Sequence, residues 1–190
     1  AVEEYEVRVG GGEPVSTPST AVDVPIAYSQ QQVSISVVAI NDQKESSGHT
    51  SPAASTTVWA VGQVNAPTVT GVKATGNSNE VRFTVAFEPG NGWAREDVRS
   101  LQWSVGNPED WQTVSEGERT VSSAALANGI STTIKVKVEV SKSGDGPKSS
   151  AVTEASGTVT PFGPPATPTV WCQPGGPAVP PTAAGLPSLS

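Results

Sequence analysis

The sequence predicts an all-β protein in which short antiparallel strands stack in two layers. Three observations carry this prediction: the composition, alternating apolar and polar residues, and a repeat of about 100 residues. The 190 residues are 35% hydrophobic, include no Met, and contain 19 Gly and 17 Pro. Val and Thr lose less side-chain freedom on a pleated strand than in a helix. Gly and Pro are turn residues, so this composition favours short strands joined by many turns.

The repeat is visible in two segments that begin at Val58 ("VWAVGQVNAPTV") and Val159 ("VTPFGPPATPTV"), 159 − 58 = 101 residues apart. Upstream, "YEVRVGGGE" from Tyr5 aligns with "LQWSVGNPE" from Leu101 at a spacing of 96, and "VSISVVA" aligns with "IKVKVEV" so that Val33 matches Ile134. A period near 100 is the size of a whole domain, whereas solenoid repeats are shorter. The repeat therefore predicts separate domains.

Three parts follow from this repeat. Residues 1–65 are expected to form an incomplete domain that begins just before its third strand, and residues 66–161 a complete one. Residues 162–190 comprise a linker, the start of a third repeat and a Pro-rich tail, "WCQPGGPAVPPTAAGLPSLS". Repeated Pro removes backbone donors, so we expect this tail to be extended or disordered.

The elements of residues 1–65 follow from their local patterns. "YEVRV" from Tyr5 alternates as a strand, and Gly10 to Gly12 form a hairpin turn. "SISVVAIN" from Ser34 is predicted as the sixth strand, "DQKESSGHTSPAA" as the connection that follows, and "STTV" as the last strand.

In residues 66–161 the alternation is clearer. Three runs each place apolar residues on one face: Val81, Phe83, Val85 and Phe87; Leu101, Trp103 and Val105; Ile134, Val136, Val138 and Val140. Strands buried on one face are typical of two antiparallel sheets packed face to face. The segments "GNSN", "EPGNG", "GNPED", "LANG" and "KSGDGP" supply turn residues between them. About seven strands in roughly 96 residues indicate a Greek-key sandwich of the immunoglobulin type.

Four segments resemble the fibronectin type III family as it occurs in tandem bacterial extracellular proteins: "AINDQKESSGHTSPA", "LANG", "EPGNGW" and the "APTV" that opens the complete unit. The resemblance implies immunoglobulin-like β-sandwiches in tandem, with strands C to G in residues 1–65, and a secreted or cell-surface location. Phe87 stands where the family usually has Trp, and Val33 and Thr132 or Ile134 where it has Tyr, which removes a corner hydrogen bond. Other immunoglobulin-like families therefore stay open.

The net charge and the cysteine content limit the classes of partner that the chain is expected to bind. The net charge of −7 and scattered basic residues argue against nucleic acid and anionic membranes, and no apolar run is long enough to insert into a membrane. Cys172 is the single cysteine, so it is expected to be a free thiol. The start "AVEEYEV" has no Met and no apolar signal region, and is interpreted as a mature protein or an excised fragment.

No residue pattern indicates catalysis, a metal or a cofactor. His49 is the only histidine and lies in a predicted loop, and the acidic pairs Glu3-Glu4, Glu96-Asp97 and Glu109-Asp110 are interpreted as divergent strand residues or hydrated loop residues. Asp145 is interpreted as a turn residue, since no Ca²⁺-binding loop is present. The chain is therefore predicted not to be an enzyme.

Tryptophans offer the only candidate ligand contacts. Trp103 is inward by alternation, whereas Trp93 and Trp111 fall at loop positions, where an indole can stack on a sugar ring or pack against a neighbouring domain. Trp93 and Trp111 are the candidate ligand-contact residues of the sequence.

The predicted function is a non-catalytic spacer and protein-interaction module of a secreted or cell-surface bacterial protein, with neighbouring domains and a protein or glycan ligand as partners. A carbohydrate-binding accessory module is one alternative. The incomplete first repeat allows three explanations: a cut from a longer array, which is preferred, an unusual short sandwich, or strands supplied by another molecule. The third makes a self-assembling subunit the second alternative.

Overall fold

The protein was analysed as a computed structural model that describes residues 1–42, 49–105, 110–154 and 159–167. These residues form strands joined by turns, with one short 3₁₀ helix, so the prediction of an all-β protein is confirmed. The elements in chain order are β1 (Val2–Val9), β2 (Val15–Thr17), β3 (Gln32–Asn41), β4 (Ala54–Trp59), β5 (Thr68–Ala74), β6 (Glu80–Ala86), η1 (Arg95–Asp97), β7 (Val98–Ser104), β8 (Gln112–Thr113), β9 (Gly117–Ser122), β10 (Lys135–Ser141) and β11 (Lys148–Glu154).

Residues 1–65, here called the N-terminal region, contain one antiparallel sheet of order β2-β1-β3-β4. Gly10 and Gly11 adopt positive φ angles of 60° and 76° in the turn after β1, as the predicted hairpin requires. The predicted strands over "SISVVAIN" and "STTV" are present as β3 and β4. Part of the connection between them, residues 43–48, lies outside the described residues.

Residues 66–167, here called the C-terminal region, contain two sheets. One has the order β11-β10-β7-β8 and the other the order β5-β6-β9. The turns between strands use left-handed residues where the sequence predicts turns, including Gly76 and Asn79 before β6 and Gly90, Asn91 and Gly92 after it. The predicted turn over "GNPED" falls largely outside the described residues.

The core of the C-terminal region draws side chains from both of its sheets. Val81, Phe83 and Val85 of β6 pack in one cluster with Trp103 of β7 and Val136 of β10. All of these side chains are almost fully buried, and the alternating residues between them in the strands are more exposed. The predicted inward faces of β6 and β10 are therefore confirmed. In β7 Trp103 is buried as predicted, but Leu101 is only half-buried and Ser104, on the opposite face, is 1% exposed.

A second cluster closes the C-terminal region at the end that meets the N-terminal region. It consists of Val64, Phe87, Trp93, Val138 and Val140. Val64 precedes β5 and Phe87 follows β6, so the cluster joins the incoming chain to the ends of the strands.

The N-terminal sheet is covered less completely. Val7 is buried, but Ile35 and Val37 on the same face are only half-buried. The loop from Ser19 to Asp23 lies beside these residues, and together they line a groove with Tyr5 and Thr17. A single layer thus leaves apolar side chains partly in contact with solvent.

The four-stranded sheets of the two regions have the same strand order. In each, the first strand (β1 or β7) lies between the short strand that follows it in the chain and a later long strand. In the N-terminal sheet Val7 pairs with Val37, and in the other sheet Leu101 pairs with Val138. Val37 and Val138 are 101 residues apart, whereas Val7 and Leu101 are 94 apart. The sequence aligns these first strands at a spacing of 96, so the pairing registers of the two sheets differ by two residues, a shift that keeps each side chain on its face.

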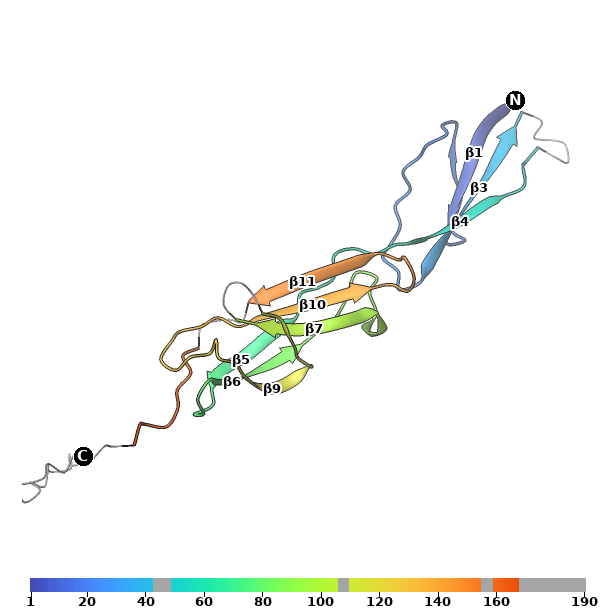
Figure 1. Ribbon diagram of the computed structural model, residues 1–190. Helices are drawn as coiled ribbons and strands as arrows, with labels where there is room; N and C mark the ends of the chain where they lie inside the picture. Colours follow the sequence, from blue (N-terminus) through green and yellow to red (C-terminus); the bar gives the residue numbers. More distant parts are fainter. Residues whose placement is uncertain (43–48, 106–109, 155–158, 168–190) are drawn as a thin grey trace, which may run out of the picture.

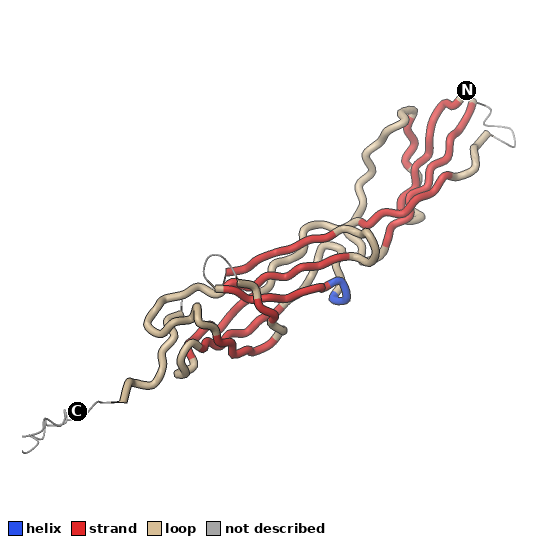
Figure 2. Tube along the Cα trace, viewed as in Figure 1, coloured by secondary structure: helices blue, strands red, loops and turns tan. Residues whose placement is uncertain are grey.

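The regions follow one another along the molecule. Figure 1 shows the N-terminal sheet beyond one end of the other two sheets, on the side of the turn that joins β10 to β11. Figure 2 shows that the segments at the meeting point are mainly loops. We call this meeting point the junction.

Candidate functional site

Trp93, one of the two candidate ligand contacts, lies inside the junction. It follows three consecutive left-handed residues, Gly90 to Gly92, in the loop between β6 and η1. Only 2% of its surface is exposed, and its indole Nε1 donates a hydrogen bond of 2.8 Å to the carbonyl of Gly62. The structure therefore shows the packing role that the sequence left as the alternative, and the ring face is not accessible to a sugar in this conformation.

A buried ion pair lies beside Trp93. Lys142 begins the turn between β10 and β11 and is 3% exposed, and Asp97 at the end of η1 is 7% exposed. The two side chains meet with Lys142 Nζ 2.7 Å from Asp97 Oδ2. The same carboxylate oxygen accepts the backbone N–H of Ala94 at 2.8 Å. Asp97 was interpreted as part of a hydrated acidic pair, and its burial corrects that interpretation.

Lys142 also connects the two regions. Its ammonium group donates a hydrogen bond of 3.0 Å to the carbonyl of Gln30 in the N-terminal region. It lies 4.8 Å from the ring centre of Trp59, at the end of β4, and 5.6 Å from that of Trp93. A cation close to an indole ring is attracted by the negative face of the ring, so residues of both regions surround one charge.

Close backbone contacts complete the junction. Gly62 N–H donates to the carbonyl of Asn91 at 3.0 Å. A Cβ atom on Gly92 would stand 2.7 Å from the carbonyl oxygen of Ala60, and one on Gly146 would stand 2.6 Å from Cβ of Lys142. The junction therefore requires glycine at two positions, one on each side of the buried lysine.

The buried charged groups of the junction are stable only when their partners are well placed. Removing two charges from water costs several kcal/mol per ion in a real protein, and this cost is offset only when geometry and additional hydrogen bonds are good. When every group of a buried polar network has a hydrogen-bond partner, one relative arrangement of the two regions is much more favourable than slightly different arrangements. The contacts of Lys142 and Asp97 thus depend on how the two regions meet.

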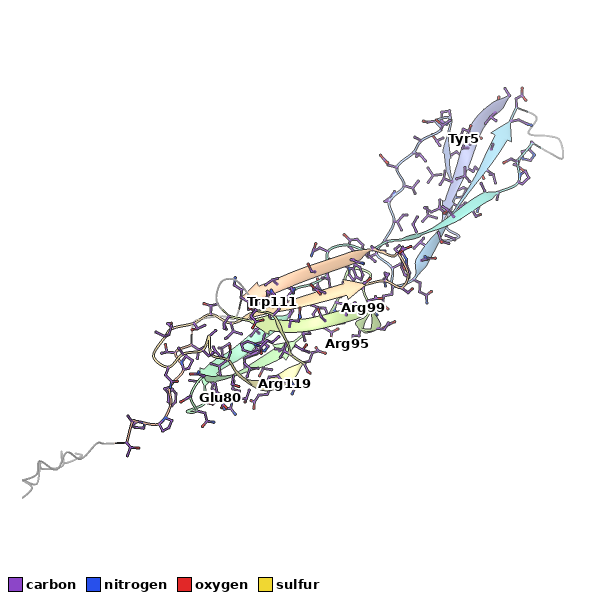
Figure 3. The ribbon with its side chains drawn as sticks, in the orientation of Figure 1. Tyr5, Glu80, Arg95, Arg99, Trp111 and Arg119 are labelled. Atoms are coloured by element: carbon purple, nitrogen blue, oxygen red, sulfur yellow. The ribbon has the colours of Figure 1, made fainter. Side chains whose placement is uncertain are left out.

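Trp111, the second candidate ligand contact, lies in the C-terminal region away from the junction (Figure 3). It is half-buried, and Lys137 Nζ of β10 lies 4.7 Å from its ring centre. Trp93 and Trp111 therefore do not form one site. The ligand-contact role of Trp111 stays a prediction.

Lys137 also forms an ion pair with Glu139 at 3.0 Å, and Ser100 donates a hydrogen bond of 2.9 Å to the same carboxylate. The hydrogen bond from Lys137 and then that from Ser100 hold the pKa of Glu139 below its ordinary value, against a smaller opposing effect of burial. This cluster lies on the outer face of the sheet, where charged groups are hydrated.

Arg95 of η1 marks an exposed ion cluster at the end of the C-terminal region (Figure 3). Its guanidinium bridges Glu88 at 2.6 Å and Glu116 at 2.5 Å, and it donates a hydrogen bond of 2.8 Å to the carbonyl of Phe87. The hydrogen bonds to Glu88 and Glu116 raise the pKa of Arg95. The arrangement ties a loop to the ends of two strands and leaves no reactive group.

The structure also describes His49 and Asp145. The carbonyl of His49 accepts the backbone N–H of Asn41 at 2.9 Å, and Asp145 is exposed in its turn. Cys172 lies outside the described residues. Within the described residues, no group of three or more His, Cys, Asp or Glu side chains is placed to hold a metal ion. In the same part of the chain, no helix has the length and apolar character needed to cross a membrane.

No family model matches the chain, and the search of curated proteins found no match.

Sequence reasoning did not find Lys142, Asp97 or Gln30 as junction residues. A lysine at the end of a strand and an aspartate in a polar loop are ordinary surface residues by pattern. The only signal was indirect, since packing against a neighbouring domain was one of the two roles expected for Trp93.

Proposed function

We propose that this chain is a non-catalytic spacer and protein-interaction segment of a secreted or cell-surface bacterial protein. In this proposal, residues 1–65 are an incomplete immunoglobulin-like unit, residues 66–161 a complete β-sandwich unit, and residues 162–190 a linker that opens a third repeat and a tail. The common strand order of the two four-stranded sheets supports a tandem arrangement. The resemblance to fibronectin type III repeats supports the bacterial extracellular context.

The observation that carries the spacer role is the buried Lys142. A flexible connection between two units would leave a lysine in water, where it is well solvated. Here its ammonium group contacts Asp97 from one region and Gln30 and Trp59 from the other. Bending at the junction would break these contacts in a poorly hydrated environment, and that cost makes the spacer stiff.

Stiffness can be measured as a distance distribution between the two regions. Spin labels are placed at Ser16→Cys in β2 and Thr120→Cys in β9, both exposed, in a Cys172→Ser background. Pulsed dipolar spectroscopy is expected to give one narrow distribution for this protein. Lys142→Met, which keeps the length of the side chain but removes its charge, is expected to broaden the distribution clearly.

Lys148→Met is the matched control, because Lys148 is an exposed lysine at the other end of the same turn. It should leave the distribution as narrow as before. A broad distribution in the unsubstituted protein, or equal widths for both methionine variants, would contradict a junction stiffened by Lys142. Small-angle scattering should also show an elongated particle, and a compact one of the same mass would exclude the spacer role.

A further inference from the structure

The outer strands of the three sheets differ in how they are protected from pairing with another strand. An edge strand exposes unpaired backbone groups, and proteins limit this exposure with short strands, Pro, charges, bulges or covering segments. The edge strand β2 has three residues and lies between Pro14 and Pro18. The edge strand β8 has only two residues.

The long edge strands of the C-terminal region are also protected. The Gln63 side chain donates a hydrogen bond to the carbonyl of Ser150 in β11, and the backbone N–H of Val64 donates to Ser149 Oγ. The pairing of β5 with β6 is interrupted after Thr70, near the left-handed Gly71. The edge strand β9 carries the charged residues Glu118 and Arg119.

In the part of the chain that the structure describes, strand β4 has none of these protections. Its six residues, "ASTTVW", contain no charge and no Pro, and its register with β3 is continuous from Trp59 to Ala54. Ala54 to Thr57 are all exposed. Within the described residues β4 pairs on one side only, and Figure 2 shows it as an outer strand. Its Thr and Val residues favour the extended conformation that strand pairing needs.

We propose that β4 is a homodimerisation edge, at which the β4 strands of two copies pair antiparallel and join two N-terminal sheets into one continuous sheet. Antiparallel pairing of identical strands obeys a twofold axis, so each copy presents the same surface to the other. The absence of charge matters here because the chain carries a net charge of −7. A neutral edge is where two such chains can approach without like charges facing each other.

The assembly is expected to stop at two copies. Once the β4 strands are paired, the free edge of the joined sheet on each side is β2. That strand is short and bordered by Pro14 and Pro18, so it does not accept a further strand. The product is a closed dimer with the two C-terminal regions at its far ends.

Sedimentation velocity over a wide concentration range tests the dimer. The full chain in a Cys172→Ser background, which removes disulfide-linked dimers, should shift reversibly from monomer to dimer. The double variant Thr56→Lys/Thr57→Lys puts a cation on each face of the strand and should weaken dimerisation by about tenfold, since like charges opposite each other destabilise strand pairing. Gln112→Lys/Thr113→Lys, which changes the edge strand β8 in the same way, should leave dimerisation unchanged.

Mixing oppositely charged variants of β4 distinguishes a loss of strand pairing from a loss of folding. Thr56→Glu/Thr57→Glu should be monomeric at concentrations where the unsubstituted chain dimerises, and a mixture with the lysine variant should form heterodimers, because opposite charges then face each other. Hydrogen exchange should show that the amides of β4 become protected as the unsubstituted chain dimerises.

Four outcomes would overturn the proposal. They are a monomer at every concentration, open-ended aggregates in place of a dimer, equal weakening by the substitutions in β8, and failure of the oppositely charged variants to pair. A dimer with no added protection of the β4 amides would likewise show that the chain associates elsewhere.

Discussion

The two regions of this protein use the same four-stranded arrangement but bury it differently. In the C-terminal region a second sheet, β5-β6-β9, supplies Val81, Phe83 and Val85 to a core shared with β7 and β10. In the described N-terminal region the corresponding face is lined by a loop, Ser19 to Asp23, and by groove residues such as Ile35. The comparison shows that the same strand order occurs with and without a second sheet, whereas the burial of its apolar face differs.

The junction adds a contribution that neither sheet supplies alone. Trp59 and Gln30 of the N-terminal region contact Lys142 of the C-terminal region, and Ser29 N–H donates a hydrogen bond of 2.8 Å to the carbonyl of Ala60 beside it. The end of the single sheet is therefore anchored to a well-packed neighbour. The N-terminal region is stabilised partly by that neighbour and less by a core of its own.

The largest expected effect comes from breaking the ion pair between Lys142 and Asp97, which lies where the two regions meet. Lys142→Met should lower the free energy of unfolding by about 3–5 kcal/mol, because Asp97 would stay buried without its cation. The double variant Lys142→Met/Asp97→Asn removes both charges and keeps an acceptor for Ala94 N–H, so it should recover most of that loss. Urea unfolding followed by tryptophan fluorescence measures both. Equal destabilisation of the single and double variants would show that the lysine acts through packing and not through its charge.

The next effect tests the difference in burial directly, with Val37 and Val138, which occupy equivalent places in the two sheets. Val138 is fully buried, so Val138→Ala should cost about 2–3 kcal/mol from lost burial and the cavity that remains. Val37 is half-buried, and Val37→Ala should cost less than about 1 kcal/mol. Chemical denaturation of the two variants provides the measurement. Similar costs would mean that the apolar face of the N-terminal sheet is buried to the same extent as that of the C-terminal region.

A smaller effect is expected from Trp93, whose ring belongs to the core next to the junction. Trp93→Phe keeps an aromatic ring but removes the Nε1–H that bonds the carbonyl of Gly62. Losing the partner of this partly buried carbonyl should cost about 1–2 kcal/mol. Trp111→Phe is a useful control, because the described hydrogen bonds at the junction do not involve the Trp111 indole. This substitution should change the stability less. Thermal unfolding of both variants measures the difference, and a larger loss for Trp111→Phe would contradict the assignment.

The same comparison shows what the sequence could predict. The inward faces of β6 and β10 follow from strict alternation, and the turns at Gly76, Gly90 and Gly10 follow from residues that tolerate positive φ. The junction could not be predicted, because Lys142 and Asp97 are 45 residues apart and neither breaks a local pattern. The two-residue difference in pairing register between the two sheets could not be predicted either, because registers that differ by two residues bury the same face.

The smallest expected effect is electrostatic and lies on the outer face of the C-terminal region, opposite its core. The pKa of Glu139 is lowered in the folded protein by Lys137 and then Ser100, so this interaction stabilises the fold above the ordinary pKa of about 4.5 and is lost as the pH falls through the folded pKa. Because 47% of the Glu139 side chain is exposed, the contribution should stay below about 1 kcal/mol. Unfolding free energies of the protein and of Glu139→Gln, measured from pH 7 to pH 3, should therefore differ at neutral pH and converge in acid. A difference that persists unchanged at pH 3 would show that the substitution acts through packing, and that the outer face contributes to stability by the same means as the core.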